Sequence, residues 1–232
     1  MISIAGLVRG FAGFGTALIF VPPAGIFLPP EQVIAVITLT GIASMAALVP
    51  RAWREGDKTE VGLLALAALV AAPFGIWSMT QLDGVIVRWI VAGVAGGTLL
   101  ALLAGWRHSG TISGIALLPI GAVAGVIGGM TGLTGPVVIL FYLSGRAVAQ
   151  SVRANTILFL AALDVVIVAN LLLRGSIDLQ LVLLASILAI PYFATSLIGQ
   201  ALFDPKHERL YRAVAYAVIG LAVLSGLPVW GL

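Results

Sequence analysis

The sequence predicts an all-α polytopic membrane protein made of two homologous four-segment halves, each with a broken first segment. Hydrophobic residues make up 61% of the 232 residues and charged residues only 9%, whereas a soluble domain has about 25% charged residues. A water-soluble protein of this size could not cover so much apolar surface with polar groups. The apolar residues also fall into long runs, two of which carry glycine-rich breaks at corresponding places.

Charged residues divide the chain into eight apolar stretches joined by short polar connectors. The stretches are residues 2–27, 33–50, 61–80, 86–105, 112–143, 154–173, 179–201 and 212–230. Most of them are close to the ~20 residues that a membrane-spanning helix needs. No connector is long enough to form a soluble domain, so we expect one integral membrane domain.

The first and fifth stretches are long, and each contains a glycine-rich break. The first reads RGFAGFGTALIFVPP at residues 9–23, and the fifth reads GVIGGMTGLTGPVVILFY at residues 125–142. Glycine and proline favour the interruption of a helix. Unwound backbone at membrane depth persists only where protein or a wet cavity satisfies its polar groups. The breaks therefore indicate an internal site.

The two broken stretches align with each other, which predicts an internal duplication. The aligned pairs are Gly10 with Gly129, Gly13 with Gly132, Thr16 with Gly135, Gly56 with Gly175, Arg88 with Arg212 and Gly96 with Gly220. We therefore expect one transmembrane repeat over residues 1–108 and a second over residues 109–232. Internal repeats with paired interrupted segments are typical of secondary transporters.

The distribution of Lys and Arg favours inverted halves. If both broken stretches are re-entrant, nine basic residues lie on one side of the membrane and two on the other. If all eight stretches cross, the split is six to five. The uneven split obeys the positive-inside rule. It predicts a multi-pass protein of the inner (plasma) membrane, with its basic loops in the cytoplasm.

The runs around the two breaks resemble the TauE/SafE family of membrane anion exporters. GLVRGFAGFGTALIFVPPAGIFLPPEQVIAV is similar to the first half of that family, and GAVAGVIGGMTGLTGPVVILFYLSGRAVAQSVRANTILFL is similar to the second. GGMTGLTGP is the most specific part. The first half departs from the family, because GFAGFGT stands where a denser glycine run is common. The resemblance implies a two-fold repeated protein that moves sulfite, sulfonates or related small organic anions.

The breaks supply the first candidate substrate-binding residues. A broken helix exposes unpaired N–H groups and a partial positive charge at the start of its second part, so two such ends meeting would form an anion cradle. The candidates are Gly13, Gly15, Thr16, Thr131, Gly132, Thr134, Gly135 and Pro136. The alternative is close helix packing, which we expect for the upstream small-residue patterns around Gly6, Gly10, Gly121 and Gly125.

Three further polar residues are candidates for contact with an anion. Arg9 lies inside an apolar stretch, where a guanidinium either binds substrate or reaches the membrane face with its long side chain. Arg153 and Asn155 open the sixth stretch. They either attract anions at the cytoplasmic mouth or anchor the helix at the interface.

Asp164 is the candidate for proton coupling. It lies about ten residues from either end of an apolar stretch. Carboxylates at such depth mark proton relays in transporters, so the position favours coupling to a proton gradient. A neutral, hydrogen-bonded acid or an ion pair with an arginine is the alternative.

These features predict a secondary transporter of a small organic or sulfur-containing anion that works by alternating access inside a lipid bilayer. Monomer and homodimer both stay open as its assembly. A passive anion channel is the alternative function. An enzyme is disfavoured, because the chain has no Cys and its two His lie in polar connectors. For the same reason we expect no metal site, and we expect no cofactor and no nucleic-acid partner.

Overall fold

The computed structural model describes residues 1–12, 14–105, 114–144, 149–202 and 208–230. Its regular secondary structure over these residues is helical throughout, which confirms the predicted all-α class. The helices are α1 (Ile2–Ala12), α2 (Thr16–Ala24), α3 (Pro30–Glu55), α4 (Lys58–Thr80), α5 (Gly84–Leu103), α6 (Leu117–Thr131), α7 (Pro136–Ser144), α8 (Ala149–Leu173), α9 (Leu179–Ala201) and α10 (Glu208–Gly226), with single 3-10 turns at Gly114–Ala116 and Pro228–Trp230.

Aspartates in two polar connectors begin the long helices α4 and α9. Asp57 Oδ1 accepts hydrogen bonds from the backbone N–H groups of Thr59 (2.9 Å) and Glu60 (3.1 Å). Asp178 Oδ1 accepts one from the N–H of Leu181 at 2.7 Å. A carboxylate at this position satisfies N–H groups that have no partner within the helix and lies at the positive end of the helix dipole. The connectors thus fix where these apolar helices start.

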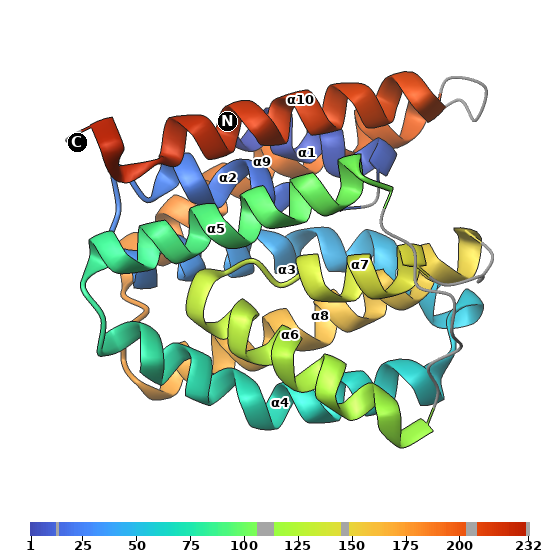
Figure 1. The fold of residues 1–232 in the computed structure, drawn as a ribbon, viewed down its shortest axis with the longest axis horizontal. Helices are drawn as coiled ribbons and strands as arrows, with labels where there is room; N and C mark the ends of the chain where they lie inside the picture. The colour runs from blue at the N-terminus through green and yellow to red at the C-terminus, as the bar shows by residue number, and fades with distance from the viewer. Residues whose placement is uncertain (13, 106–113, 145–148, 203–207, 231–232) are drawn as a thin grey trace.

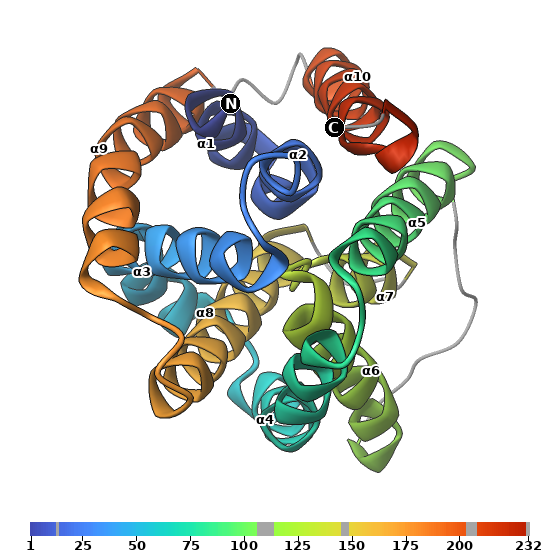
Figure 2. The same ribbon diagram turned by 90° about the vertical axis from the view of Figure 1, so that its left-hand side faces the viewer.

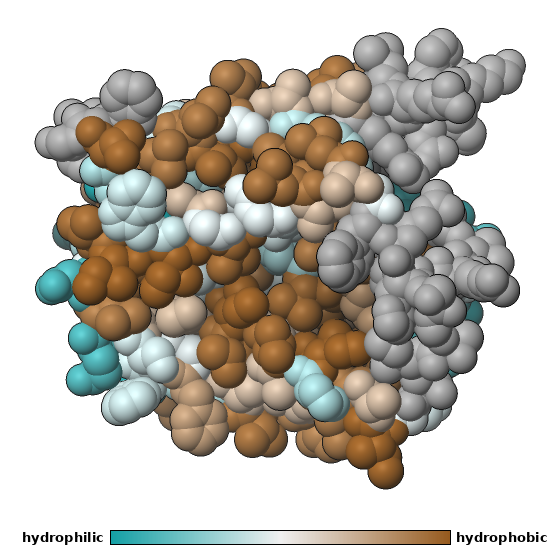
Figure 3. All heavy atoms as spheres, viewed as in Figure 1, coloured by the Kyte–Doolittle hydropathy of each residue, from teal (hydrophilic) through white to brown (hydrophobic). Residues whose placement is uncertain are grey.

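The surface is that of a membrane protein. Within the described residues, five helices are long and apolar enough to cross a membrane: α4, α5, Gly114–Thr131, Gln150–Leu173 and α9. Large hydrophobic side chains are exposed on α4, α5 and α9, among them Phe74, Leu100 and Ile190. Figure 3 shows apolar residues over most of the visible face. Lipid chains rather than water suit such a surface, so the chain is a multi-pass membrane protein.

The helices form two groups around a central pair (Figures 1 and 2). Helices α3 and α8 pack against each other in the middle. We call α1, α2, α9 and α10, which pack together on one side, the first lobe. We call α4, α5, α6 and α7 on the other side the second lobe, in which α4 packs on α6, and α5 contacts α6 and α7 and also packs against α10 of the first lobe. Each lobe combines a broken segment from one predicted half with two plain helices from the other.

The core follows the central helix α8. Phe159, Leu163, Ile167 and Leu171 are almost completely buried and recur every four residues, which places them along one face of the helix. Helix α3 packs against both α8 and α9, and α8 also packs against α4. The central pair therefore connects the two lobes through apolar contact.

Candidate functional site

The first broken segment folds back as a helical hairpin. Gly15 precedes α2 with a φ of +99°, a left-handed conformation that glycine adopts without strain. A Cβ atom placed on Gly15 would lie 3.6 Å from Cγ1 of Val8 in α1. In one continuous helix, residues seven apart would be separated by about 10 Å along the axis. The chain therefore reverses direction at the predicted break.

The second broken segment reverses in the same way. Gly132 ends α6 with a φ of +73° and donates its N–H to the carbonyl of Gly128. A Cβ atom on Gly128 would lie 3.3 Å from Cα of Thr134, so the chain returns over the end of α6. In Figure 1, α7 runs back from the turn that follows α6. The predicted breaks are both present, and each forms a hairpin.

Glycines upstream of the breaks hold each hairpin against a helix of the other predicted half. A Cβ atom on Gly10 would lie 2.3 Å from the carbonyl oxygen of Ser196 in α9. A Cβ atom on Gly129 would lie 2.4 Å from the carbonyl oxygen of Ala72 in α4. No side chain fits at such distances, so these glycines serve close helix packing. Gly6 and Gly125 make the same kind of contact one turn earlier.

The start of α2 lies inside the first lobe. The hydroxyl groups of Thr16 and Tyr192 are 3.0 Å apart and share a hydrogen bond, and both side chains are buried. Ile219 of α10 is also close, since its Cδ1 would lie 3.9 Å from a Cβ atom on Gly15. Thr16 is thus bonded to α9, a partner that the sequence analysis did not identify. Gly13, the remaining candidate of this break, lies outside the described residues.

The second break is bonded mainly to itself. Thr131 Oγ1 donates a hydrogen bond to the carbonyl of Ile127 (2.6 Å) and accepts one from the N–H of Leu133 (3.1 Å). The expected donor to an anion is therefore engaged at the end of α6. Thr134, Gly135 and Pro136 are also buried.

The starts of α2 and α7 belong to different lobes, and the joint cradle of two meeting helix ends stays a prediction. Helix α5 packs against both α2 and α7, whereas α2 and α7 make no extensive contact with each other in the described chain. Gly132 instead approaches Ile34 and Ile37 of α3 and Val21 of α2. The second break therefore faces the central helix α3.

Arg9 and Asp164 lie in one neighbourhood. The charge of Arg9, near the tip of the first hairpin, acts on both Arg153 and Asp164 of α8. Arg9 Nε is buried without a hydrogen-bond partner among the described residues. Asp164 is half-buried, and a Cβ atom on Gly41 would lie 2.9 Å from its Oδ2. Glycine in α3 thus makes room for this carboxylate.

Asn155 ties α8 to the connector before α4. Its buried Oδ1 accepts a hydrogen bond from the backbone N–H of Asp57 (2.7 Å), and its Nδ2 donates to Glu60 Oε1 (3.4 Å). At the opposite end of the two central helices, Ser176 donates to the carboxylate of Glu31. Arg153 is exposed beside this polar region. The arrangement leaves Arg153 accessible, while Asn155 has bonds within the protein.

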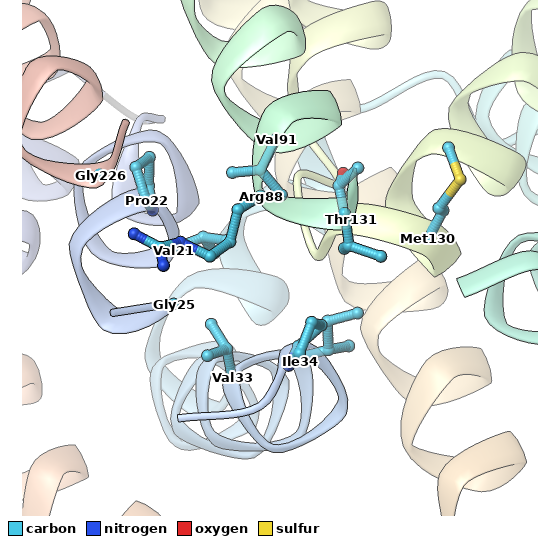
Figure 4. Close-up of a pocket in the computed structure, with 12 residues that line it drawn as sticks. Val21, Pro22, Gly25, Val33, Ile34, Arg88, Val91, Met130, Thr131 and Gly226 are labelled. Carbon is cyan, nitrogen blue, oxygen red and sulfur yellow. The ribbon is translucent and has the colours of Figure 1, made fainter. Parts of the chain in front are cut away.

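A pocket lies where the two lobes meet. Its walls come from α2 and the end of α10 in the first lobe, from α5 and the end of α6 in the second, and from the start of α3 (Figure 4). The empty space of the pocket, counted together with the open solvent at its mouth, is about 320 Å³. Thr131 and Arg88 are among its lining residues. In the sequence, Arg88 stands out only through its pairing with Arg212 in the predicted repeat.

Membrane-spanning helices arranged as two lobes, each with a broken hairpin, are typical of a polytopic membrane transport protein. The model of the sulfite exporter TauE/SafE family matches residues 1–226. The chain therefore belongs to the TauE/SafE family, and the resemblance of its two glycine-rich runs is confirmed. Membership implies export of sulfite- or sulfonate-type anions across a membrane. No curated protein and no solved structure matches the chain.

Proposed function

We propose that the protein is a secondary transporter of a small organic or sulfur-containing anion, and that it works by alternating access between its two lobes. The observation that carries the proposal is the pocket at the junction of the lobes, beside the second break. A change in the angle between the lobes would alter access to such a pocket. Family membership supplies the class of solute.

The exchange of helices between the lobes supports two inverted halves. The first hairpin packs against α9, and the second packs against α4, the corresponding helix of the other half. Gly10 lies against the backbone carbonyl of Ser196, and Gly129 lies against that of Ala72 in the same way. In Figure 1, α5 and α10, which are equivalent in the two halves, run in opposite directions. Inverted repeats of this kind let one structure face either side of the membrane in turn.

Asp164 is the residue proposed to couple transport to protons. It lies on the central helix α8, between the lobes, and Gly41 leaves space for its carboxylate. Arg9 is close enough for their charges to interact. Loss or gain of a proton would change that interaction, and the first hairpin carries Arg9. Protonation could thereby bias how the hairpin sits against α8.

Flux measurements test this function. Purified protein in proteoliposomes is given labelled sulfite, ethanesulfonate or acetate, with and without an imposed pH gradient. We expect gradient-driven accumulation of one anion class by the wild type and its loss in Asp164→Asn. Asp83→Asn, which removes an exposed carboxylate before α5, is the matched control and should accumulate as the wild type does.

The alternative outcomes separate the rival functions. Flux that only equalises concentrations, at the same rate in wild type and Asp164→Asn, would indicate a passive anion channel. Absence of movement for every anion, in protein shown to be folded, would contradict the transport proposal altogether. Accumulation that survives in Asp164→Asn would keep the transporter and remove the role of Asp164.

A further inference from the structure

The pocket between the lobes has an apolar wall with one strong charge. Valine, isoleucine, proline and methionine side chains form most of the lining. Among the described lining residues, Arg88 is the only charged one. Thr131 also lines the pocket, but its hydroxyl proton is directed to the carbonyl of Ile127. Any anion in this space would therefore meet Arg88 as its main polar partner.

Backbone contacts determine where Arg88 sits. Arg88 is in the first turns of α5, whose start at Gly84 packs against Pro30 of α3. Its side-chain stem passes Gly25, where an added Cβ atom would be 3.6 Å from Arg88 Cγ. In Figure 4 the guanidinium extends from α5 toward Val21 and Pro22 of α2. The charge is thus carried by the second lobe and directed toward the first.

The end of α10 closes this part of the pocket. A Cβ atom on Gly226 would lie 2.5 Å from the backbone of Pro22, so α10 and α2 are in direct backbone contact there. Arg88 itself is half-buried and its Nε is buried, so the guanidinium between the two lobes has reduced contact with water. Reduced contact with water strengthens the attraction between a cation and an anion.

We infer that Arg88 is the anion-recognition residue of this pocket, and that its ligand is a small monovalent oxyanion with a short apolar group. The inference rests on the proposed function and adds the binding residue to it. A planar guanidinium can hold a sulfonate or carboxylate through two parallel hydrogen bonds. The valine and isoleucine walls would contact the apolar part. Short alkanesulfonates match both requirements, whereas organic cations do not.

A structural role for Arg88 makes a different prediction. The guanidinium lies near the C-terminal end of α2, where the helix dipole favours a positive charge. If Arg88 served only that purpose, its loss would lower stability without changing anion affinity in the folded protein. Affinity and stability must therefore be measured separately.

Calorimetric titration of the full chain in lipid nanodiscs tests the inference, with ethanesulfonate as ligand and ethylammonium as the cationic control. We expect ethanesulfonate to bind the wild type and Arg88→Gln to weaken the Kd by about tenfold or more, since one charged hydrogen-bonded contact contributes about 1.4 kcal/mol or more. Arg88→Lys keeps the positive charge but not the planar guanidinium, so its Kd for ethanesulfonate should lie between those of the wild type and Arg88→Gln. Arg174→Gln, an exposed arginine outside the pocket, is the matched charge control and should bind within about twofold of wild type.

A steric variant keeps the test independent of the charge. Gly25→Leu places a side chain beside Arg88, where the nearest atoms are 3.5–3.6 Å from an added Cβ, so the backbone tolerates it while the pocket fills. It should also weaken ethanesulfonate binding by about tenfold or more, because the leucine side chain would occupy the space beside Arg88 that the anion enters. Unchanged affinity in folded Arg88→Gln and Gly25→Leu would overturn the inference, as would equal binding of ethylammonium.

Flux data distinguish this failure from failure of the proposed function. If the wild type accumulates an anion in proteoliposomes and Arg88→Gln does so equally well, the transporter remains and the role of Arg88 is wrong. If the wild type neither binds nor moves any anion, both proposals fail. The expected result is transport by the wild type together with weakened binding and flux in Arg88→Gln.

Discussion

The two broken hairpins share a scaffold but differ at their breaks. In both, two glycines one turn apart let the first helix pack closely against backbone carbonyl groups of another helix. Gly6 and Gly10 pack against α9, and Gly125 and Gly129 pack against α4. At the break itself, the first hairpin has a left-handed glycine before α2, and the second has one after α6. The helix contacts are thus common to both hairpins, whereas the two turns differ in geometry.

The polar groups at the two turns differ as well. Thr16 reaches across to Tyr192 of another helix, whereas Thr131 bonds to its own helix and turn. Arg9 precedes the first turn, and the equivalent position before the second is Gly128. Close backbone contacts therefore set the shared architecture of the two hairpins, and the few polar side chains at the turns distinguish one hairpin from the other.

The largest expected effect comes from filling the shared glycine contacts. Gly10→Leu and Gly129→Leu should each destabilise the protein by about 3 kcal/mol or more, because backbone would have to move apart. Thermal unfolding in detergent measures the loss. Gly93→Leu, with no atom within 4 Å of an added Cβ, is the matched control and should stay near wild type. If only one of Gly10→Leu and Gly129→Leu were destabilised, the two hairpins would not be equivalent in their packing.

The turns themselves should respond unequally. Alanine at either left-handed glycine costs about 1–2 kcal/mol of backbone strain. Gly132→Ala should cost more than Gly15→Ala, since its Cβ would meet Ile34 Cγ1 at 3.2 Å, whereas the nearest atom to Gly15 is 3.6 Å away. Comparison of the two unfolding midpoints checks the order, and the reverse order would contradict the geometry.

The hydrogen bond of Thr16 gives a smaller effect. Thr16→Val leaves the buried Tyr192 hydroxyl without this partner and should cost about 1 kcal/mol. In a Tyr192→Phe background, Thr16→Val should cost less stability than it costs in the wild type, because the two hydroxyls share one hydrogen bond. A double-mutant cycle in unfolding experiments measures the coupling. Strict additivity would mean that the bond contributes nothing.

The smallest effect is expected in the last turns of α3. The hydrogen bond from Arg51 Nε, 2.9 Å long, lowers the pKa of Glu55 below its ordinary value of 4.5. A lowered pKa means that the pair stabilises the fold above pH 4.5, and that this stability is lost as the pH falls further. Arg51 is largely exposed, so the contribution is small. Glu55→Gln should unfold at a slightly lower temperature than the wild type at pH 7, and at the same temperature as the wild type at low pH.

Much of the fold follows from local features of the sequence. The apolar stretches, the two breaks and the packing role of the upstream glycines were predictable, because helix length and glycine spacing act over short distances. Which helix each hairpin packs against was not. The contacts of Gly10 with Ser196 and of Gly129 with Ala72 join distant segments, and no periodicity along the chain encodes them.

The candidate site was predictable only in part. The breaks and Asp164 stand out because glycine runs and a carboxylate are unusual in apolar stretches. Arg88 did not, since it lies near the start of a stretch, where arginine commonly flanks a membrane helix. Its importance depends on Gly25 and Pro22 being brought alongside by the fold. Likewise, only coordinates reveal that the Thr131 hydroxyl is bonded to Ile127.

The exchange of helices between the lobes also sets an order for biogenesis. The second hairpin is synthesised after α4, so Gly129 can pack against Ala72 as soon as the hairpin is inserted. Gly10 meets Ser196 only after α9 has been made, much later in the chain. Until α9 is inserted, the first hairpin stays in the bilayer without its packing partner. Nascent chains that stop before α9 should therefore be the ones that membrane proteases and chaperones recognise.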